Sequence, residues 1–263
     1  MNNGLLFNVK DIFFSYDSAP VIKGIRLQLS RGKFYGIVGP NGCGKTTFLD
    51  LLTGSRTPQQ GTIEFKGERL DSYPKKRLAK SLALVPQEYD TGFGFSVEDM
   101  VLMGRHPHID RFASPGQEDW QKVDQSLELI GIDHLRKRPI NSLSGGQKQR
   151  VVVARALAQN SEVLLFDEAT SNLDIKYTLQ IFNLARQLVD KEERTVIAVI
   201  HNLNLAAAYC DEICFINDGK IAACGPTAST LTESLIGSVF GVDSRISWDE
   251  YSNSHQISYR YKG

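Results

Sequence analysis

Four short apolar runs divide the chain, and each is followed by polar or glycine-rich residues. They are FYGIVG (34–39), LALVP (82–86), VLLF (163–166) and TVIAVI (195–200). Runs that are apolar at consecutive positions and partly β-branched or aromatic are typical of strands buried on both faces. Helical patterns lie between them, for example KYTLQIFNLARQLVDKEE (176–193). The pattern therefore predicts an α/β core built on a parallel sheet.

The stretches outside this core alternate between apolar and polar positions. Residues 5–35 and 60–72 do so between turn sequences, which favours antiparallel strands that flank the parallel sheet. Residues 227–263 form a tail, in which TESLIGSVFGV (232–242) has a helical pattern. SRISWDEYSNSHQISYRY (244–261) alternates around a polar turn, which predicts a hairpin.

Residues 90–155 have a different character from the core. They begin with a passage of loop and helix that carries several aromatic residues. EDWQKVDQSLELIGI (118–132) follows as an amphipathic helix, because its apolar residues recur at helical spacing on one face. That face consists of Trp120, Val123, Leu127 and Ile130. The segment is therefore predicted to be a helical subdomain inserted between two core strands.

The charge balance excludes one class of partner. Lys and Arg number 30, as do Asp and Glu, so the formal net charge is zero and the whole chain has no basic field for nucleic acid. No apolar run reaches the roughly 20 residues that a bilayer span needs. The first residues, MNNGLLFNVKDIFF, lack the layout of a signal peptide. We expect a cytosolic protein that binds no nucleic acid.

The cysteines do not suggest a metal site. Cys43, Cys210, Cys214 and Cys224 form no CxxC pair, and no histidine cluster accompanies them. The residues between Cys210 and Cys214 have the pattern of a passage from a helix to a strand. Reduced thiols without zinc are therefore expected.

A glycine-rich loop follows the first apolar run. GPNGCGKT (39–46) fits G-x-x-x-x-G-K-[ST] between a buried strand and a helix, the context that this motif requires. Its backbone N–H groups surround phosphate oxygens, Lys45 is expected to reach the β- and γ-phosphates, and the Thr46 hydroxyl to bind Mg²⁺. A plain glycine-rich turn is the weaker alternative. The predicted nucleotide contacts are Gly39, Pro40, Asn41, Gly42, Cys43, Gly44, Lys45, Thr46 and Thr47.

Polar residues also follow the other three runs, at the sheet edge where open parallel sheets bind ligands. Asp167 is expected to bind Mg²⁺, and Glu168 to orient or deprotonate the attacking water. His201 is a candidate for contact with the γ-phosphate and the water. Gln87 is a candidate to contact Mg²⁺ or the water and to relay their state to the inserted subdomain. The alternatives are that Asp167 and Glu168 cap the next helix, that His201 is merely structural and that Gln87 is an ordinary loop residue.

Two further features concern the nucleotide. Tyr16 is a candidate to stack on adenine, although core packing or simple exposure explains a loop tyrosine nearly as well. LSGGQ (143–147) starts a helix at Ser144 with two glycines, and such a start favours an anion by roughly 0.3–1 kcal/mol. An ordinary N-cap explains Ser144 but not Gly145 and Gly146, which weaken a helix start that has no ligand to approach.

These motifs occur in a recognisable order. GPNGCGKTT, Gln87, LSGGQ, LLFDEATSNLD (164–174) and His201 resemble the nucleotide-binding subunit of an ABC transporter, over essentially residues 5–226. The resemblance implies a P-loop NTPase (RecA-like) core with a flanking antiparallel sheet and an inserted helical subdomain. It also implies that residues 1–226 form the ATP-binding domain and that residues 227–263 pack on it.

The resemblance implies ATP hydrolysis with Mg²⁺ in a head-to-tail dimer. In this family Ser144, Gly145, Gly146 and Gln147 would cover the γ-phosphate bound to the loop of the second copy, and Asp174 would link the two sites. Two identical phosphate-binding elements then make two composite sites under two-fold symmetry. ATP joins the subunits, and its hydrolysis releases them.

The segment after Gln87 resembles a subgroup that drives import of metal chelates such as siderophores, haem and cobalamin. Gly104-Arg105-His106-Pro107 and the LTESLIGSVFGVD stretch of the tail carry this resemblance. It implies two integral membrane permease subunits, which dock on the inserted subdomain, and an external substrate-binding protein that acts indirectly. The chain would lie at the cytoplasmic face of the inner or plasma membrane.

Two positions depart from the family pattern. Ala169 stands where most relatives have Pro, and Asn202 where many have Asp. Neither change deletes a ligand, so they bear on the basal rate rather than on the reaction. An ABC exporter subunit and a soluble ABC ATPase of an assembly system are the alternative functions. A regulator that hydrolyses nothing is disfavoured, because Glu168 and His201 are both present.

Overall fold

The computed structural model describes residues 4–87, 94–170 and 173–260. The chain forms two compact units. The first contains the residues up to Tyr73 and those from Leu188 onward, and the second contains Pro74–Gln187. The boundary falls within helix α6 (Ile175–Glu192).

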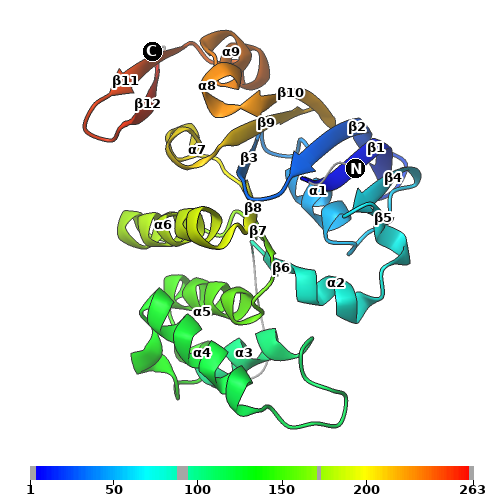
Figure 1. Cartoon of the computed structure of the whole chain (residues 1–263). Coiled ribbons are helices and arrows are strands. Elements are labelled where there is room, and N and C mark those ends of the chain that lie inside the picture. Colours follow the sequence, from blue (N-terminus) through cyan, green and yellow to red (C-terminus); the bar gives the residue numbers. More distant parts are fainter. Residues whose placement is uncertain (1–3, 88–93, 171–172, 261–263) are drawn as a thin grey trace. The chain divides into compact units, whose positions relative to one another are not determined.

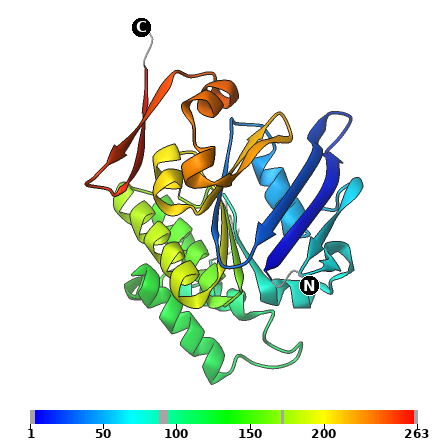
Figure 2. The ribbon, with the colours of Figure 1, turned by 45° about the horizontal axis from the view of Figure 1, so that its top comes forward.

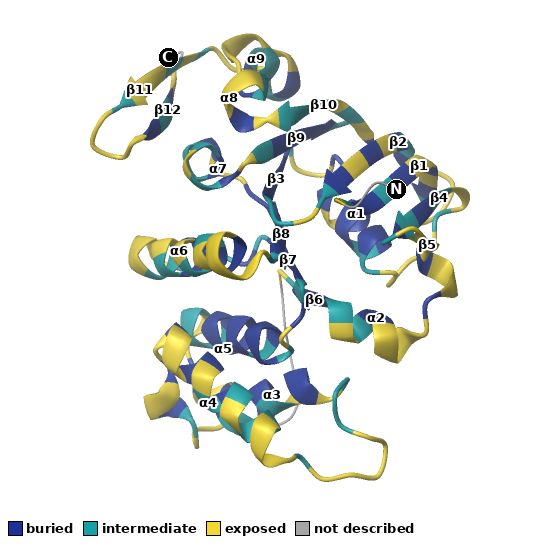
Figure 3. Cartoon of the chain, viewed as in Figure 1, coloured by how far each residue is buried: buried dark blue, intermediate teal, exposed yellow. Residues whose placement is uncertain are grey.

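The first unit contains an antiparallel sheet with the strand order β2-β1-β4-β5. Its inward residues are buried and its outward residues exposed, which Figure 3 shows as alternating dark blue and yellow along β1 and β2. Phe7 and Phe65 pack together on the buried face, with ring centroids 4.9 Å apart. The predicted flanking antiparallel sheet is therefore confirmed. The strands are β1 (Leu5–Ser15), β2 (Pro20–Ser30), β4 (Gln60–Phe65) and β5 (Glu68–Arg69), after which a 3₁₀ turn spans Leu70–Ser72.

A second sheet in this unit contains two of the four predicted core strands. β3 (Phe34–Val38) and β8 (Thr195–Val199) are parallel neighbours, and all their residues are buried. On its other side β3 pairs in parallel with β9 (Glu212–Asn217), which pairs antiparallel with β10 (Lys220–Pro226). The apolar run ICFI in β9 was missed in the sequence analysis. Helices α1 (Lys45–Leu52) and α7 (Leu203–Tyr209) follow β3 and β8 (Figure 1).

One expectation about the cysteines is wrong. Cys214 and Cys224 form a disulfide between β9 and β10. The two residues are direct partners in the antiparallel register, so their side chains leave the same face of the sheet at close range. Cys43 and Cys210 are buried and are not part of this disulfide.

The C-terminal segment forms two short helices and the predicted hairpin. These elements are α8 (Thr227–Thr230), α9 (Glu233–Phe240), β11 (Ser244–Asp249) and β12 (Ser254–Tyr259), and Figure 2 shows the hairpin beyond α9. The Asn204 side-chain carbonyl on α7 accepts a hydrogen bond from the Ile257 amide at 2.6 Å. The hairpin is thereby attached to the helix that follows β8.

The second unit contains the other two core strands and a group of packed helices. β6 (Leu82–Val85) and β7 (Val163–Asp167) are parallel neighbours. Helices α3, α4 and α5 contact one another, and Val123, Leu127 and Ile130 of the predicted apolar face are fully buried between them. The helices are α2 (Lys75–Ser81), α3 (Val97–Leu102), α4 (Gln117–Ile130) and α5 (Gly145–Ala158), with 3₁₀ turns at Met103–Arg105, Asp133–Leu135 and Ile140–Ser142.

Parts of two predicted segments cannot be compared with the structure. Residues 90–93, at the start of the predicted insertion, and residues 171–172, in the SNLD segment, lie outside the described residues. In the described part of the chain, no helix combines the length and the apolar character that crossing a bilayer requires.

Two leucines of α4 test the predicted helical face. Leu127 is fully buried, whereas Leu129 is 49% exposed. Leu127→Ala should lower the free energy of unfolding by about 2–5 kcal/mol, because it removes buried methyl groups and leaves a cavity. Leu129→Ala should change it by less than about 0.5 kcal/mol. Urea unfolding of both variants measures the difference, and equal losses would contradict this packing of α4.

Candidate functional site

The glycine-rich loop connects β3 to α1 in the first unit. Lys45 is the first residue of α1, and its side chain is only 5% exposed. Its ammonium donates hydrogen bonds to the carbonyl oxygens of Gly39 (3.0 Å) and Pro40 (2.9 Å). The side chain therefore folds back over the loop, and its cation lies beside the backbone of residues 39–46.

Helix α1 begins without a side-chain cap. Its N-cap, Gly44, has φ of 104°, a left-handed conformation that favours glycine. A helix start that lacks a capping side chain has first-turn N–H groups to offer to an anion. Thr46 is exposed in this turn, and Thr47 is buried. Burial raises the pKa of the neighbouring Cys43 thiol, so this cysteine adds no negative charge to the loop at neutral pH.

Tyr16 lies next to the start of α1. Its hydroxyl is 3.2 Å from the Thr47 hydroxyl, and the side chain of the tyrosine remains 49% exposed. The Arg56 guanidinium lies over its ring, 4.4 Å from the centroid, and Arg56 also donates to the Asp50 carboxylate at 3.1 Å. One face of the Tyr16 ring is thus occupied by Arg56, which the sequence analysis did not identify.

His201 follows β8, the parallel neighbour of β3. Ile37 pairs with Val199 near the ends of the two strands, and the Ile200 amide donates to the Ile37 carbonyl at 3.0 Å. The phosphate-binding loop and the exposed His201 therefore leave the same edge of this sheet. Asn202 caps α7, because its side-chain oxygen accepts from the Asn204 and Leu205 amides at 2.9 and 3.3 Å. An asparagine serves this structural role without the charge of aspartate.

Three predicted residues come together in the second unit. Gln87 follows β6, Asp167 ends β7, and Glu168 comes directly after it. The Gln87 amide donates to the Glu168 carboxylate at 2.7 Å. Glu168 has φ of 50°, which is uncommon for a non-glycine residue and occurs in turns and at functional sites. Asp167 is buried, and the following Ala169 is buried as well.

Ser144 begins α5 with a capping box. Its hydroxyl accepts from the Gln147 amide at 3.3 Å, and its own amide donates to the Gln147 side chain at 3.0 Å. Gly145 is exposed, and apart from its own helix and chain neighbours nothing in the described structure lies within 4 Å of the place that its Cβ would occupy. Packing within this chain therefore does not require glycine there.

Asp174 precedes α6 and caps it. Its carboxylate accepts from the Tyr177 amide at 3.0 Å, and its carbonyl accepts from the Thr178 amide at 2.9 Å. The side chain is exposed. Helix capping accounts for an acidic residue at this position, and a link between two nucleotide sites stays a prediction.

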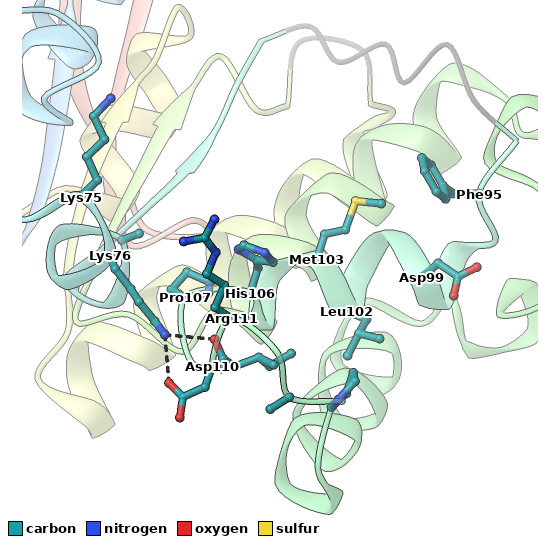
Figure 4. Close-up of a pocket in the computed structure, with 14 residues that line it drawn as sticks. Lys75, Lys76, Phe95, Asp99, Leu102, Met103, His106, Pro107, Asp110 and Arg111 are labelled. Carbon is teal, nitrogen blue, oxygen red and sulfur yellow. Dashed lines mark hydrogen bonds and ion pairs between the residues drawn. The ribbon is translucent and has the colours of Figure 1, made fainter.

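The second unit also contains a large pocket, with a volume of about 1050 Å³. Figure 4 shows side chains from α2 on one wall and from the segment after α3 on the other. Lys76 joins the walls, because its ammonium donates to the Ile109 carbonyl at 3.0 Å and contacts the Asp110 carboxylate at 3.2 Å. The apolar lining includes Phe95, Leu102, Met103 and Pro107. Sequence analysis did not detect this pocket, because its walls are distant in sequence.

The comparisons place these features among known proteins. Residues 22–171 match the family model described as ABC transporter. The cobalamin import ATP-binding protein of Halobacterium salinarum is 38% identical over 226 residues, which are 86% of this chain and 56% of that protein. The chain thus spans little more than half the length of this relative.

Solved structures give a similar result. The structure of a transporter assigned to the metal-chelate type of ABC transporters, in an inward-facing conformation, matches with a TM-score of 0.84 and 32% identity, over 98% of each chain. A dimeric ATP-binding cassette in a post-hydrolysis state, bound to ADP and Pi, matches with a TM-score of 0.76 and 26% identity. That match covers 84% of this chain and 99% of the cassette. The α/β P-loop fold predicted from the motifs is confirmed.

Proposed function

Because this chain belongs to the ABC transporter family, we propose that it is the ATP-hydrolysing subunit of an importer for a metal chelate. The observation that carries hydrolysis is the Gln87–Glu168 hydrogen bond. Binding ATP requires only the phosphate-binding loop, whereas hydrolysis also requires a base that is oriented toward water. The hydrogen bond from the Gln87 amide holds the Glu168 carboxylate in one orientation, as a base that activates water requires.

The loop residues 39–47 are assigned to the phosphates, with Lys45 at the β- and γ-phosphates and Tyr16 at the adenine. Since Arg56 covers one face of the Tyr16 ring, the adenine would stack on the other. Glu168 is the proposed base, His201 contacts the γ-phosphate, and Gln87 reports on the site to the helices of the second unit.

Thr46, Gln87 and Asp167 are the proposed Mg²⁺ ligands, together with the phosphates. Their oxygens are of the kind that Mg²⁺ prefers, and this ion commonly uses one or two protein ligands and keeps several waters. When bound, the ion would neutralise charge that develops on the phosphates.

The partner of the signature segment Ser144–Gln147 is proposed to be the nucleotide of a second copy. The open space at Gly145 supports an approach from outside the chain, and the similar cassette described as dimeric supports the assembly. Asp174 would contribute to the link between the two composite sites. ATP then closes the dimer, and hydrolysis reopens it.

The remaining assignments concern the surroundings of this ATPase. Residues 1–226 would form the ATP-binding domain with its helical insertion at about 90–155, and residues 227–263 a tail on it, as the Asn204–Ile257 hydrogen bond suggests. Each of two permease subunits would dock in the second-unit pocket of one copy and place the chain at the cytoplasmic face of the membrane. An external binding protein would deliver the chelate, and the cobalamin import relative supports this class of substrate.

Glu168→Gln removes the proposed base and preserves its size. This variant should bind ATP, fail to hydrolyse it and accumulate as a dimer, because the ATP that joins the subunits persists. Light scattering after gel filtration with ATP and Mg²⁺ measures the mass. Glu128→Gln, an exposed change on α4, should behave like the wild type, and Lys45→Ala should stay monomeric. A monomeric, active Glu168→Gln variant would refute the assignment of the base.

Purification of the tagged chain from gently solubilised cells tests the importer proposal. A membrane protein with many spans should be recovered in equal amount, and its binding should be lost when Met103 in the pocket is changed to Asp. The apolar wall explains the loss, because a buried unpaired carboxylate is costly. Recovery of purely soluble partners would overturn the transport proposal and favour an assembly ATPase.

A further inference from the structure

The last turn of α5, the helix that begins with Ser144, is attached to the segment that follows α3. The Arg105 Nη1 donates to the Ala158 carbonyl at 2.9 Å, and the ring Nε2 of His108 lies 2.9 Å from the Gln159 carbonyl. Final carbonyls of a helix have no partner within the helix, and the negative end of its dipole favours a cation. Arg105 and His108 supply the donors, and Arg105 supplies the charge.

Arg105 is fixed in this position by Asp119 of α4. Its side chain is buried, and its Nε donates to the Asp119 Oδ1 at 2.9 Å. The other carboxylate oxygen accepts from the Gly116 amide at 2.9 Å. Burial raises the pKa of Asp119, but the Gly116 amide and Arg105 outweigh it, so the pKa lies below its ordinary value. A guanidinium has donors on several nitrogens and serves helix and carboxylate together, which a lysine does not.

The segment and the helix also approach closely through their backbones. A Cβ on Gly104 would lie 2.1 Å from the Arg155 carbonyl oxygen, so only glycine permits this contact. Burial lowers the pKa of His108, and its ring is therefore neutral at pH 7. Because the Gln159 carbonyl can only accept, the hydrogen of that neutral ring lies on Nε2.

Gln159 attaches the same end of α5 to a second segment. Its side-chain amide donates to the carbonyls of Ala79 in α2 and Leu82 at the start of β6. β6 leads within a few residues to Gln87, which donates to Glu168. One end of α5 is thus hydrogen-bonded to both α2 and the Gly104–His108 segment.

These two segments are the walls of the pocket. Lys75, Lys76 and Ala79 of α2 line one side, and Met103, His106 and Pro107 line the other (Figure 4). α5 has 14 residues and is therefore about 21 Å long. A displacement of the walls at its C-terminal end is carried to Ser144 at its N-terminal end, because a helix moves as a rigid element.

We propose that Arg105 and Gln159 are positioning residues, which make the orientation of Ser144 and Gly145 depend on what occupies the pocket. The proposal rests on the proposed function, in which the occupant is a permease segment. A docked permease fixes the distance between the two walls, and the walls fix the position of the C-terminal end of α5. The signature segment at the other end of α5 meets the nucleotide of the second copy.

Arg105→Lys in the assembled complex tests this role. The lysine retains a charge for Asp119, but its single nitrogen cannot occupy both the Nε position at the carboxylate and the Nη1 position at the Ala158 carbonyl. The kcat of permease-stimulated hydrolysis should fall about tenfold or more, since small misplacements of groups at a site have effects of this size. The KM for ATP should be unchanged, because Lys45 and its loop are untouched. Arg136→Lys is the matched control, since Arg136 pairs with Asp124 and Asp133 and should give wild-type turnover.

Gln159→Met provides a second variant with similar side-chain volume and should lower the stimulated kcat in the same way. Amide hydrogen exchange provides a second measurement. If Arg105 and Gln159 had a purely structural role, the variants would not alter the change in exchange rate on assembly with the permease. Assembly with the permease should slow exchange in the last turn of α5 in the wild type, and this gain should be absent in both variants.

Three outcomes would overturn the proposal. If Arg105→Lys retains wild-type stimulation by the permease, the contacts of Arg105 serve only to pack the helices together. If that variant fails to assemble, wild-type stimulation in Gln159→Met would have the same meaning. A wild-type complex that hydrolyses no ATP would overturn the proposed function and the positioning role with it, and this result is distinguishable because it does not depend on either variant.

Discussion

One physical constraint underlies the candidate site: the start of a helix binds phosphate only where its backbone N–H groups are accessible. α1 begins at Gly44 without a capping side chain, with Lys45 folded over the loop before it. α5 begins at Ser144 with a capping box, and the glycine that follows faces open space. Both starts can offer donors and a dipole to an anion. In α1 the lysine is the first helical residue and folds over the loop, whereas Lys148 is the fourth residue of α5.

This difference explains why one chain has two such helix starts. The α1 start has what is needed to bind the nucleotide of its own chain. The α5 start is exposed at Ser144 and Gly145, and its lysine, Lys148, is only the fourth residue of the helix, so this start suits the far side of a phosphate that is already bound elsewhere. In the proposed head-to-tail dimer, two-fold symmetry would give both helix starts a role in each of two sites, and the energy of ATP binding would bring two copies together.

Much of the fold follows from local sequence patterns. The apolar runs at 34–39 and 195–200 form β3 and β8, and the alternating tail forms β11 and β12. Burial on both faces of a strand requires consecutive apolar residues, and burial on one face requires alternation, so both kinds of strand can be predicted from the sequence. β9 was missed although its ICFI run is equally apolar. The Cys214–Cys224 disulfide was missed because it depends on the register between two strands.

The candidate site was predictable where a motif lies within one short segment, as at Lys45 and Ser144. Contacts between distant segments were not. The Gln87–Glu168 hydrogen bond joins residues 81 positions apart, and Arg56, which follows α1 in the sequence, lies over the ring of Tyr16, which precedes β3. Arg105 stood out only as part of a subgroup pattern, and its contact with the end of α5 is visible only when the helices are packed.

Complementation between two defective chains tests the central claim most directly. Lys45→Ala disables the loop and Ser144→Arg disables the signature segment, so each variant alone should be inactive. In a mixed dimer, the intact loop of the Ser144→Arg chain meets the intact signature segment of the Lys45→Ala chain. Hydrolysis of ATP by purified mixed dimers that carry different tags should therefore recover. No recovery, with both variants folded and paired, would mean that the signature segment serves its own chain.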